Sequence, residues 1–558
     1  MPAPARLLVA LALSVVPLAA CAPTDRAEQE ATVDTIDTVE QPALVLLLVV
    51  DQMRADYLDR FGPQLTGGFA TLLEDSAVFA NARQDHAITA TAPGHSAMLS
   101  GLYPRDSGII DNTWFDRARG TRQGAVSDAD EGIVGLGDLG VANDGPGVSP
   151  RQFLGTSLVG WLKDRDPRSQ AVSISRKDRS AVLMTPEAEH VYWWHAPSGR
   201  FVTSTYYGEW LPEWVEAFNA DDWLAEHLGG SWELLAPEAA YDISRPDDYP
   251  GERPPPGFGR VFPHPLPADR QALGARIRAT PYMDEATLDL GRVAITELGL
   301  GGDEVTDVLA LSLSSTDSIG HAFGPFSREV QDQILQLDQI LGSFLAFVEQ
   351  AVGLERTLIV LTSDHGVVPV PEYSRELGED AEGLRLADIY RGINERLGAA
   401  PDTRWFSSSS YGWIQVDREL ARQRGVDADD LVRQARAYIE TLDSVAAVFS
   451  RDELAEDRAP GSELEELVRR SFYAERSGDL YLVHQPLSQW QSGSASNHQS
   501  PYDYDRRVPL ILRGPGIRPG SYANPAAVVD IAPTLARILG VTAPAGLEGR
   551  VLDEAIAR

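Results

Sequence analysis

The chain has 558 residues, of which 43% are hydrophobic and 23% charged, so it is long enough for one large globular domain with insertions or for several average domains. Its formal charge of -34 argues against a nucleic-acid partner, because phosphate backbones are bound through clustered Lys and Arg. The charge does not exclude a small anionic substrate, since a few local cations or metal ions can override the overall field.

Residues 1–21 have the features of an export signal. Arg6 is followed by an apolar stretch at 7–18, shorter than the ~20 residues of a membrane span, and then by small residues. The sequence LAAC at 18–21 resembles the bacterial lipoprotein signal, in which cleavage precedes a cysteine that is then lipidated. The alternative is an ordinary secretory signal with a chance cysteine. We expect lipidation at Cys21, the only cysteine of the chain, and an exported protein that is periplasmic or anchored to the outer membrane.

Residues 22–42 are rich in Asp, Glu, Thr and Ala without periodicity, which is typical of a flexible acidic tether. We expect residues 43–558 to form the folded domain. No later segment is apolar enough to span a membrane, so the N-terminal lipid is the only membrane attachment that the sequence predicts. Nothing in the sequence indicates an oligomeric state.

Five short apolar runs have the uninterrupted Val, Leu and Ile composition of strands buried on both faces. They are residues 43–50, 171–175, 307–315, 356–363 and 507–514. Helical patterns lie between them, for example at 284–299 and 328–352. The alternation predicts an α/β fold with a doubly wound, mostly parallel sheet flanked by helices.

Polar residues follow four of these runs directly. The first run ends in Asp51, the second in RKDR at 176–179, the third in Thr316 and Asp317, and the fourth in Asp364 and His365. In open α/β sheets, ligands bind beyond the carboxyl ends of the strands. We therefore expect the four endings to converge on one crevice.

Two segments look like insertions that would form cap elements around the mouth of this crevice. Residues 190–265 hold six of the 11 Trp and many Pro, and residues 400–490 carry a mixed strand and helix pattern. The alternative for the first segment is that its Trp cluster is the core of a subdomain.

Three Asp and three His make up a candidate metal centre. They are Asp51, Asp317, His321, Asp364, His365 and His498. Asp and neutral His are usual ligands for zinc, and the set is large enough for two metals with open coordination positions. A lone Asp at a strand end is more often a helix cap and a lone His is usually structural, so the prediction depends on the joint pattern.

The segment TATAPGHSAMLSG at 89–101 offers several hydroxyl groups but nothing local that would activate them. The Pro93–Gly94 pair predicts a turn that lifts the hydroxyl of Thr91 out of the backbone run. We expect His95 to have a structural or supporting role, and Ser96 and Ser100 to belong to the helix that follows.

In the order of its motifs, the chain resembles the alkaline phosphatase superfamily, and specifically the PafA-like phosphate-irrepressible alkaline phosphatases, which share a core with nucleotide pyrophosphatase/phosphodiesterases. The resemblance covers nearly all of the mature chain. It runs from VVDQMRADYLDRF through the 89–116 segment, ISRKDRSAV, SSTDSIGHAFGP and TSDHG to HQSPYDYDRRVPLILRGPGI.

The resemblance implies two zinc ions and a role for each motif residue. One zinc would be held by Asp51, Thr91, Asp364 and His365, and the other by Asp317, His321 and His498. Thr91 would be the nucleophile, activated by its metal, and would form a phosphothreonine intermediate. Asn112, Lys177 and Arg179 would contact the non-bridging phosphoryl oxygens.

The Lys177 and Arg179 pair favours small-molecule phosphate monoesters, because a monoester dianion presents more charged oxygens than a diester. A phosphodiesterase or nucleotide pyrophosphatase of the same superfamily is the alternative. Sulfatase chemistry is disfavoured, because TAPGH lacks the Ser or Cys and the Arg of the sulfatase pattern. A non-catalytic lipoprotein that binds phosphate compounds is a further alternative, although no expected ligand or nucleophile is missing. A phosphoglycerate mutase-like enzyme would use a Ser nucleophile and manganese, and would not carry an export signal.

Overall fold

The computed structural model describes residues 41–137, 146–400, 403–407 and 410–557. The expected lipoprotein signal with Cys21 and nearly all of the expected tether lie outside these ranges. None of the helices within them combines the length and the apolar character that crossing a membrane requires.

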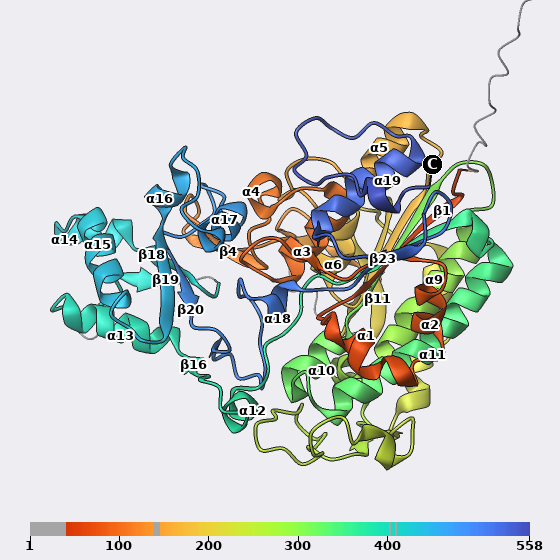
Figure 1. The fold of residues 1–558 in the computed structure, drawn as a ribbon, viewed down its shortest axis with the longest axis horizontal. Coiled ribbons are helices and arrows are strands. Elements are labelled where there is room, and N and C mark those ends of the chain that lie inside the picture. The colour runs from red at the N-terminus through yellow and green to blue at the C-terminus, as the bar shows by residue number, and fades with distance from the viewer. Residues whose placement is uncertain (1–40, 138–145, 401–402, 408–409, 558) are drawn as a thin grey trace, which may run out of the picture. The chain divides into compact units, whose positions relative to one another are not determined.

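A ten-stranded sheet forms the centre of the fold (Figure 1). Its strand order is β23-β2-β22-β15-β1-β14-β9-β10-β11-β7. The bounds are Gly520–Tyr522, Ala77–Phe79, Leu510–Arg513, Thr357–Thr362, Leu44–Val50, Asp307–Leu313, Ala171–Ser175, His190–His195, Arg200–Ser204 and Ile133–Val134, in that order. The five strands from β15 to β10 are parallel, whereas β22 and β11 run antiparallel to their inner neighbours. The prediction of a doubly wound α/β fold with a mostly parallel sheet is confirmed for the central strands. Toward both edges the sheet contains antiparallel pairs.

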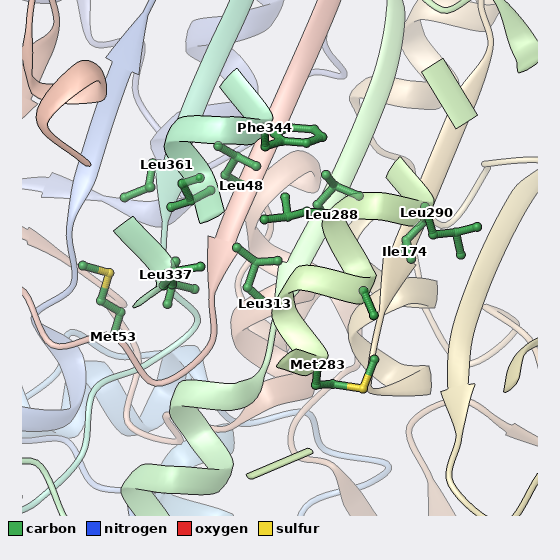
Figure 2. Close-up of a cluster of buried hydrophobic side chains, with 14 of the residues drawn as sticks. Leu48, Met53, Ile174, Met283, Leu288, Leu290, Leu313, Leu337, Phe344 and Leu361 are labelled. Atoms are coloured by element: carbon green, nitrogen blue, oxygen red, sulfur yellow. The ribbon is translucent and has the colours of Figure 1, made fainter. Parts of the chain in front are cut away.

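Alternate residues of β1 enter two separate hydrophobic cores. Leu46 and Leu48 pack with helices α9 (Tyr282–Leu298) and α11 (Arg328–Ala351), where Figure 2 shows Leu48 near Phe344. Val45 and Leu47 pack on the other face with α3 (Thr91–Ser100), α6 (Asp178–Met184) and α19 (Ile531–Leu539). Because helices cover both faces, the central strands read as continuous apolar runs.

The prediction of an insertion at 190–265 is wrong for its first part, because residues 190–204 form β10 and β11 of the central sheet. The sequence HVYWWH looks unlike the other strands because aromatic side chains replace the aliphatic ones. Trp193 faces one core of the sheet and Trp194 and Trp232 the other, so these three belong to the main cores. By contrast, Trp210 is 82% exposed.

The second expected insertion is a small α/β unit with its own hydrophobic core. Its sheet has the order β17-β18-β20-β19, with bounds Phe406–Ser407, Trp413–Val416, Leu480–His484 and Val445–Ser450. Helices α13 (Leu386–Arg396) and α15 (Ala428–Ile439) pack on it. Trp413 and Tyr481 also pack against Ile88, three residues before Thr91. This unit therefore supports the segment that leads into α3.

Candidate active site

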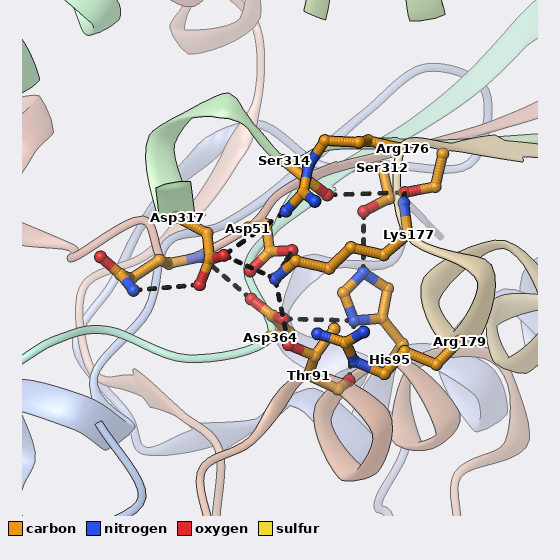
Figure 3. Close-up of polar contacts among 12 residues, drawn as sticks. Asp51, Thr91, His95, Arg176, Lys177, Arg179, Ser312, Ser314, Asp317 and Asp364 are labelled. Atoms are coloured by element: carbon orange, nitrogen blue, oxygen red, sulfur yellow. Dashed lines mark hydrogen bonds and ion pairs between the residues drawn. The ribbon is translucent and has the colours of Figure 1, made fainter. Parts of the chain in front are cut away.

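The polar residues that follow the parallel strands lie together, with Lys177 at their centre. Its Nζ atom lies 2.6 Å from Oδ2 of Asp51, after β1, and 2.8 Å from Oδ2 of Asp317, in helix α10 (Ser315–Phe323) after β14. Figure 3 shows the lysine between these carboxylates, with Asp364, from the end of β15, beside them. Residues up to 313 positions apart in the sequence thus share one buried cluster.

Thr91 is buried and is the first residue of α3. Its Oγ1 atom accepts a hydrogen bond of 3.1 Å from Nζ of Lys177. The turn predicted at Pro93–Gly94 is wrong, because both residues lie in the first turn of α3, where a proline is tolerated. A Cβ atom at Gly94 would lie 2.4 Å from the carbonyl oxygen of Asp364, so this glycine allows the helix to approach the end of β15. Ser96 belongs to the same helix.

Asp317, His321 and His498 form one group of metal-ligand type, with donor atoms within 4.8 Å of one another. Nε2 of His321 lies 3.3 Å from Oδ1 of Asp317, and Nε2 of His498 lies 4.0 Å from the same atom. Each Nδ1 is within hydrogen-bond distance of a backbone carbonyl, 2.8 Å from Ser496 and 2.6 Å from Thr89. If each Nδ1 carries the proton, Nε2 is the atom able to bind a metal.

Asp51 belongs to two further groups of metal-ligand type, one with His95 and Asp364 and the other with Asp317 and His365. Nδ1 of His95 and Nε2 of His365 are 3.2 and 3.4 Å from Oδ2 of Asp364. Both ring nitrogens of His95 lie within hydrogen-bond distance of other groups, a backbone carbonyl at 2.8 Å and a serine hydroxyl at 2.9 Å. Within the described ranges, Nε2 of His365 and Oδ2 of Asp364 are buried without a hydrogen-bond partner. His365 therefore fits a metal ligand better than His95 does.

The electrostatics of the cluster also fit bound cations. Asp51, Asp317 and Asp364 are each at most 4% exposed. Burial raises the pKa of Asp51, and the other two carboxylates raise it further. Burial acts in the same direction on Asp317, but Lys177 and His321 outweigh it and hold the pKa of that carboxyl well below its usual range. Buried carboxylates are stable only when counter-charges are close, which a metal supplies.

His498 has the properties of a neutral ligand. Burial lowers the pKa of its imidazole well below the usual value, and the neighbouring His365 and His321 lower it further. The rings of His498 and His365 are stacked at 3.6 Å between centroids. Neutral imidazole is the form that binds metals, so this environment favours coordination over protonation.

Asn112 and Arg179 lie at the mouth of the same site. Oδ1 of Asn112 accepts hydrogen bonds from Nε of Arg179 at 3.1 Å and from the backbone amide of Ala92 at 2.8 Å. The side-chain NH2 group of Asn112 is thereby left to donate hydrogen bonds to a ligand. Both side chains line a cavity of about 230 Å³ together with Thr91 and Lys177. The cavity offers amide, guanidinium and ammonium donors to an anion beside the Thr91 hydroxyl.

Gln52 is a site residue that the sequence reasoning missed. Its backbone amide donates to Oδ1 of Asp364 at 3.0 Å and its side chain donates to Oδ1 of Asp317 at 3.0 Å. The backbone of Gln52 has a φ of 67°, which is uncommon for a residue other than glycine. A Cβ at Gly320 would lie 1.9 Å from Oε1 of Gln52, so the glycine of DSIGH makes room for this side chain. The only signal was its position directly after Asp51.

Arg176 was also missed, although it begins the RKDR segment. Its guanidinium lies 3.6 Å from Oδ2 of Asp317. Burial lowers the pKa of Arg176, and the nearby positive charges of Arg278 and Arg179 contribute in the same direction. Arg176 therefore joins Lys177 and Arg179 as a basic residue of the site.

Comparisons with known proteins agree with this arrangement. The profile of the Type I phosphodiesterase / nucleotide pyrophosphatase family matches residues 45–505. The chain is 32% identical to a Myroides odoratus protein named calcium-transporting ATPase, over 93% of this chain and 96% of that protein. It is 31% identical to alkaline phosphatase PafA of Elizabethkingia meningoseptica, over 94% of this chain and 96% of PafA.

A solved structure of alkaline phosphatase PafA, with substitutions at a threonine, an asparagine, a lysine and an arginine, has the same fold. The TM-score is 0.87 at 29% identity, and the match covers 93% of this chain and all of PafA. The chain therefore belongs to the Type I phosphodiesterase / nucleotide pyrophosphatase family of the alkaline phosphatase superfamily and is a PafA-like phosphatase.

Proposed function

We propose that the protein is an exported, zinc-dependent phosphate monoester hydrolase that acts through a phosphothreonine intermediate on Thr91. The observation that carries the proposal is the position of the Thr91 hydroxyl. It is buried, 3.1 Å from the ammonium of Lys177, and lines the same cavity as Asp317, His321 and His498.

Two groups of side chains would hold the metals. Asp51, Thr91, Asp364 and His365 would hold one zinc ion, and Asp317, His321 and His498 the other. Two divalent ions, when bound, stabilise the attacking and leaving oxygens of phosphoryl transfer. The mixed carboxylate and imidazole donors, and the buried donor atoms of Asp364 and His365 without hydrogen-bond partners, suit zinc.

Thr91 forms and later breaks the covalent bond to phosphorus. Its Oγ1 gives up its proton to solvent and attacks the phosphorus atom, and the ester P–O bond breaks as the leaving oxygen takes up a proton and departs as the alcohol. Water then loses a proton and attacks the phosphothreonine, the bond from phosphorus to Oγ1 breaks, Oγ1 regains a proton, and inorganic phosphate departs. Because Thr91 begins α3, the helix dipole favours negative charge on Oγ1 in both steps.

Asn112, Lys177 and Arg179 would bind the non-bridging oxygens and stabilise the charge that develops on them. In the substituted PafA structure the threonine and the asparagine are 21 residues apart and the lysine and the arginine two apart. Thr91 and Asn112, and Lys177 and Arg179, have the same spacings here. The match supports equivalent positions for the four residues. An ammonium and a guanidinium together suit the dianion of a monoester.

Diester hydrolysis is the second candidate, because the matching family is described by phosphodiesterase and pyrophosphatase activity. The test compares p-nitrophenyl phosphate with bis-p-nitrophenyl phosphate on one sample whose metal content is measured. We expect the monoester to be hydrolysed much faster, with about two zinc ions bound per chain. Faster hydrolysis of the diester would replace the monoesterase proposal. Export and lipidation at Cys21 remain predictions, which mass spectrometry of the mature N-terminus would test.

A further inference from the structure

A second, larger cavity adjoins the candidate active site. Its volume is about 1070 Å³, and it shares Lys177, Arg179, Asp317 and His321 with the smaller cavity at Thr91. From there it reaches the segment 254–256 and the end of helix α8 (Arg270–Arg276) with the short helix that follows it. A substrate whose phosphate lies at Thr91 could therefore extend its leaving group into this cavity.

The lining of this cavity is strongly basic. Six of its residues carry a guanidinium or an ammonium: Arg176, Lys177, Arg179, Arg253, Arg276 and Arg278. Only Glu252 and Asp317 are acidic, in a chain with 82 acidic and 48 basic residues. The carboxylate of Glu252 is paired with Arg245 at 2.6 Å, so its negative charge is offset by Arg245 and not by the arginines of the lining. The local charge is thus opposite to that of the whole chain.

Arg276 and Arg278 differ from the other basic residues of this cavity. Within the part of the chain that the structure describes, their side chains make no ion pair and no hydrogen bond. Arg253, by contrast, donates to two backbone carbonyls at 2.8 and 2.9 Å. Arg276 is half-buried and Arg278 is exposed. An anion bound in the cavity would supply the partner that both guanidinium groups lack among the described residues.

We propose that this cavity binds a second phosphate group on the leaving group of the substrate, with Arg276 and Arg278 as its main contacts. The inference depends on the proposed monoesterase function and names its substrate class. Small molecules with two phosphate groups separated by a short chain would be better substrates than their singly phosphorylated counterparts. Arginine suits this role because its planar fork matches phosphate oxygens.

The test uses hexane-1,6-diol bisphosphate and hexyl phosphate, which have the same chain and the same type of leaving alcohol. Two equivalent phosphates raise kcat/KM about twofold by statistics alone. We define the ratio as kcat/KM for the bisphosphate divided by kcat/KM for hexyl phosphate. At low ionic strength we expect a ratio of about ten or more, since a factor of ten corresponds to one good charge-assisted contact of ~1.4 kcal/mol. In Arg276→Gln/Arg278→Gln the ratio should fall to about two, and in Arg276→Lys/Arg278→Lys it should stay above two.

The matched control is Arg422→Gln/Arg433→Gln, which removes the same charge from exposed positions that pair with Glu419 and Asp430. It should leave the ratio unchanged. A ratio of about two in the wild type, or an unchanged ratio in Arg276→Gln/Arg278→Gln, would overturn the inference. If neither hexyl phosphate nor p-nitrophenyl phosphate is hydrolysed by the wild type, the monoesterase proposal itself fails. The two failures are therefore distinguishable. Circular dichroism checks the folding of each variant, and the single variants replace any double variant that does not fold.

Discussion

The ammonium of Lys177 lies 3.1 Å from Oγ1 of Thr91 and 2.6 Å from a carboxylate oxygen of Asp51. One side chain therefore links the proposed nucleophile to the proposed metal ligands. Because β9 and β1 end at the same edge of the sheet, this contact is fixed by the fold and not by a flexible loop. A charge at this point acts on any phosphoryl group that Thr91 attacks.

Replacing Lys177 with Ala should lower kcat/KM for p-nitrophenyl phosphate on the order of 10²-fold, the usual loss for one electrostatic contact to the transition state. The diester should be affected less, because it presents fewer charged oxygens. Steady-state kinetics on both substrates provide the measurement.

Lys163 is a matched control, since it is the only other lysine of the chain and pairs with Glu189 at the surface. Lys163→Ala should leave both rates within about twofold, as expected for an exposed ion pair. Equal losses on monoester and diester in Lys177→Ala would show that Lys177 does not read the extra phosphoryl charge.

Replacing Thr91 with Ala should abolish turnover, by on the order of 10⁴-fold or more, while the fold and the bound metal are retained. The side chain makes one hydrogen bond, to Lys177, so its loss does not disturb the core. Thr91→Ser should keep part of the activity because it keeps a hydroxyl. The control is Ser96→Ala on the same helix, whose hydroxyl donates, among the described residues, only to the carbonyl of Pro93. Substantial turnover by Thr91→Ala would exclude Thr91 as the nucleophile.

Removal of metal by a chelator should abolish activity and lower the melting temperature, because Lys177 is then the main counter-charge left beside three buried carboxylates. Zinc should restore both. His321→Ala should bind about one metal ion fewer per chain, whereas His195→Ala, at the end of β10, should bind the full complement. Full activity in a sample shown by elemental analysis to be metal-free would contradict the assignment.

Asp284 makes stability depend on pH. Burial raises its pKa from 3.8 to about 7 in the folded chain. Because the folded pKa exceeds the unfolded one, its contribution is complete below pH ~4 and is lost as the pH rises through about 7. The loss is at most ~1.4 kcal/mol per pH unit.

Asp284→Asn should therefore gain stability relative to the wild type as the pH rises from 4 to 8. Gln333 donates to Asp284 and can rotate its amide to accept from an Asn, since its Oε1 has no hydrogen-bond partner within the described residues. Denaturant melts at several pH values provide the measurement. A constant difference between variant and wild type would show that Asp284 does not titrate in this range.

The sequence predicted the parallel centre of the fold because strands covered on both faces must be apolar throughout, as β1 and β15 are. It could not predict the edges. β7 and β2 have only two and three residues, too few for any periodicity to show, and β23 reads GSY. The aromatic residues of β10 suggest an insertion because they do not match the aliphatic pattern of the other strands.

The acidic residues of the site were predictable because they follow strands directly. The close contacts between segments that are far apart in the sequence were not predictable. The Pro93–Gly94 pair predicts a turn, whereas Gly94 allows contact between α3 and the end of β15, 270 residues later. The positive φ of Gln52 cannot be predicted from the order of the residues. The same is true of the contacts at both ring nitrogens of His95. Such features depend on which segments the fold brings together.

The most direct test of the central claim is the detection of the covalent intermediate. Enzyme mixed with p-nitrophenyl phosphate is quenched in acid within milliseconds, digested and analysed by mass spectrometry. We predict a phosphoryl group on Thr91 in the wild type and none on the corresponding peptide of Thr91→Ala. Absence of phosphothreonine in a wild-type sample that turns over substrate, together with activity in Thr91→Ala, would contradict the account.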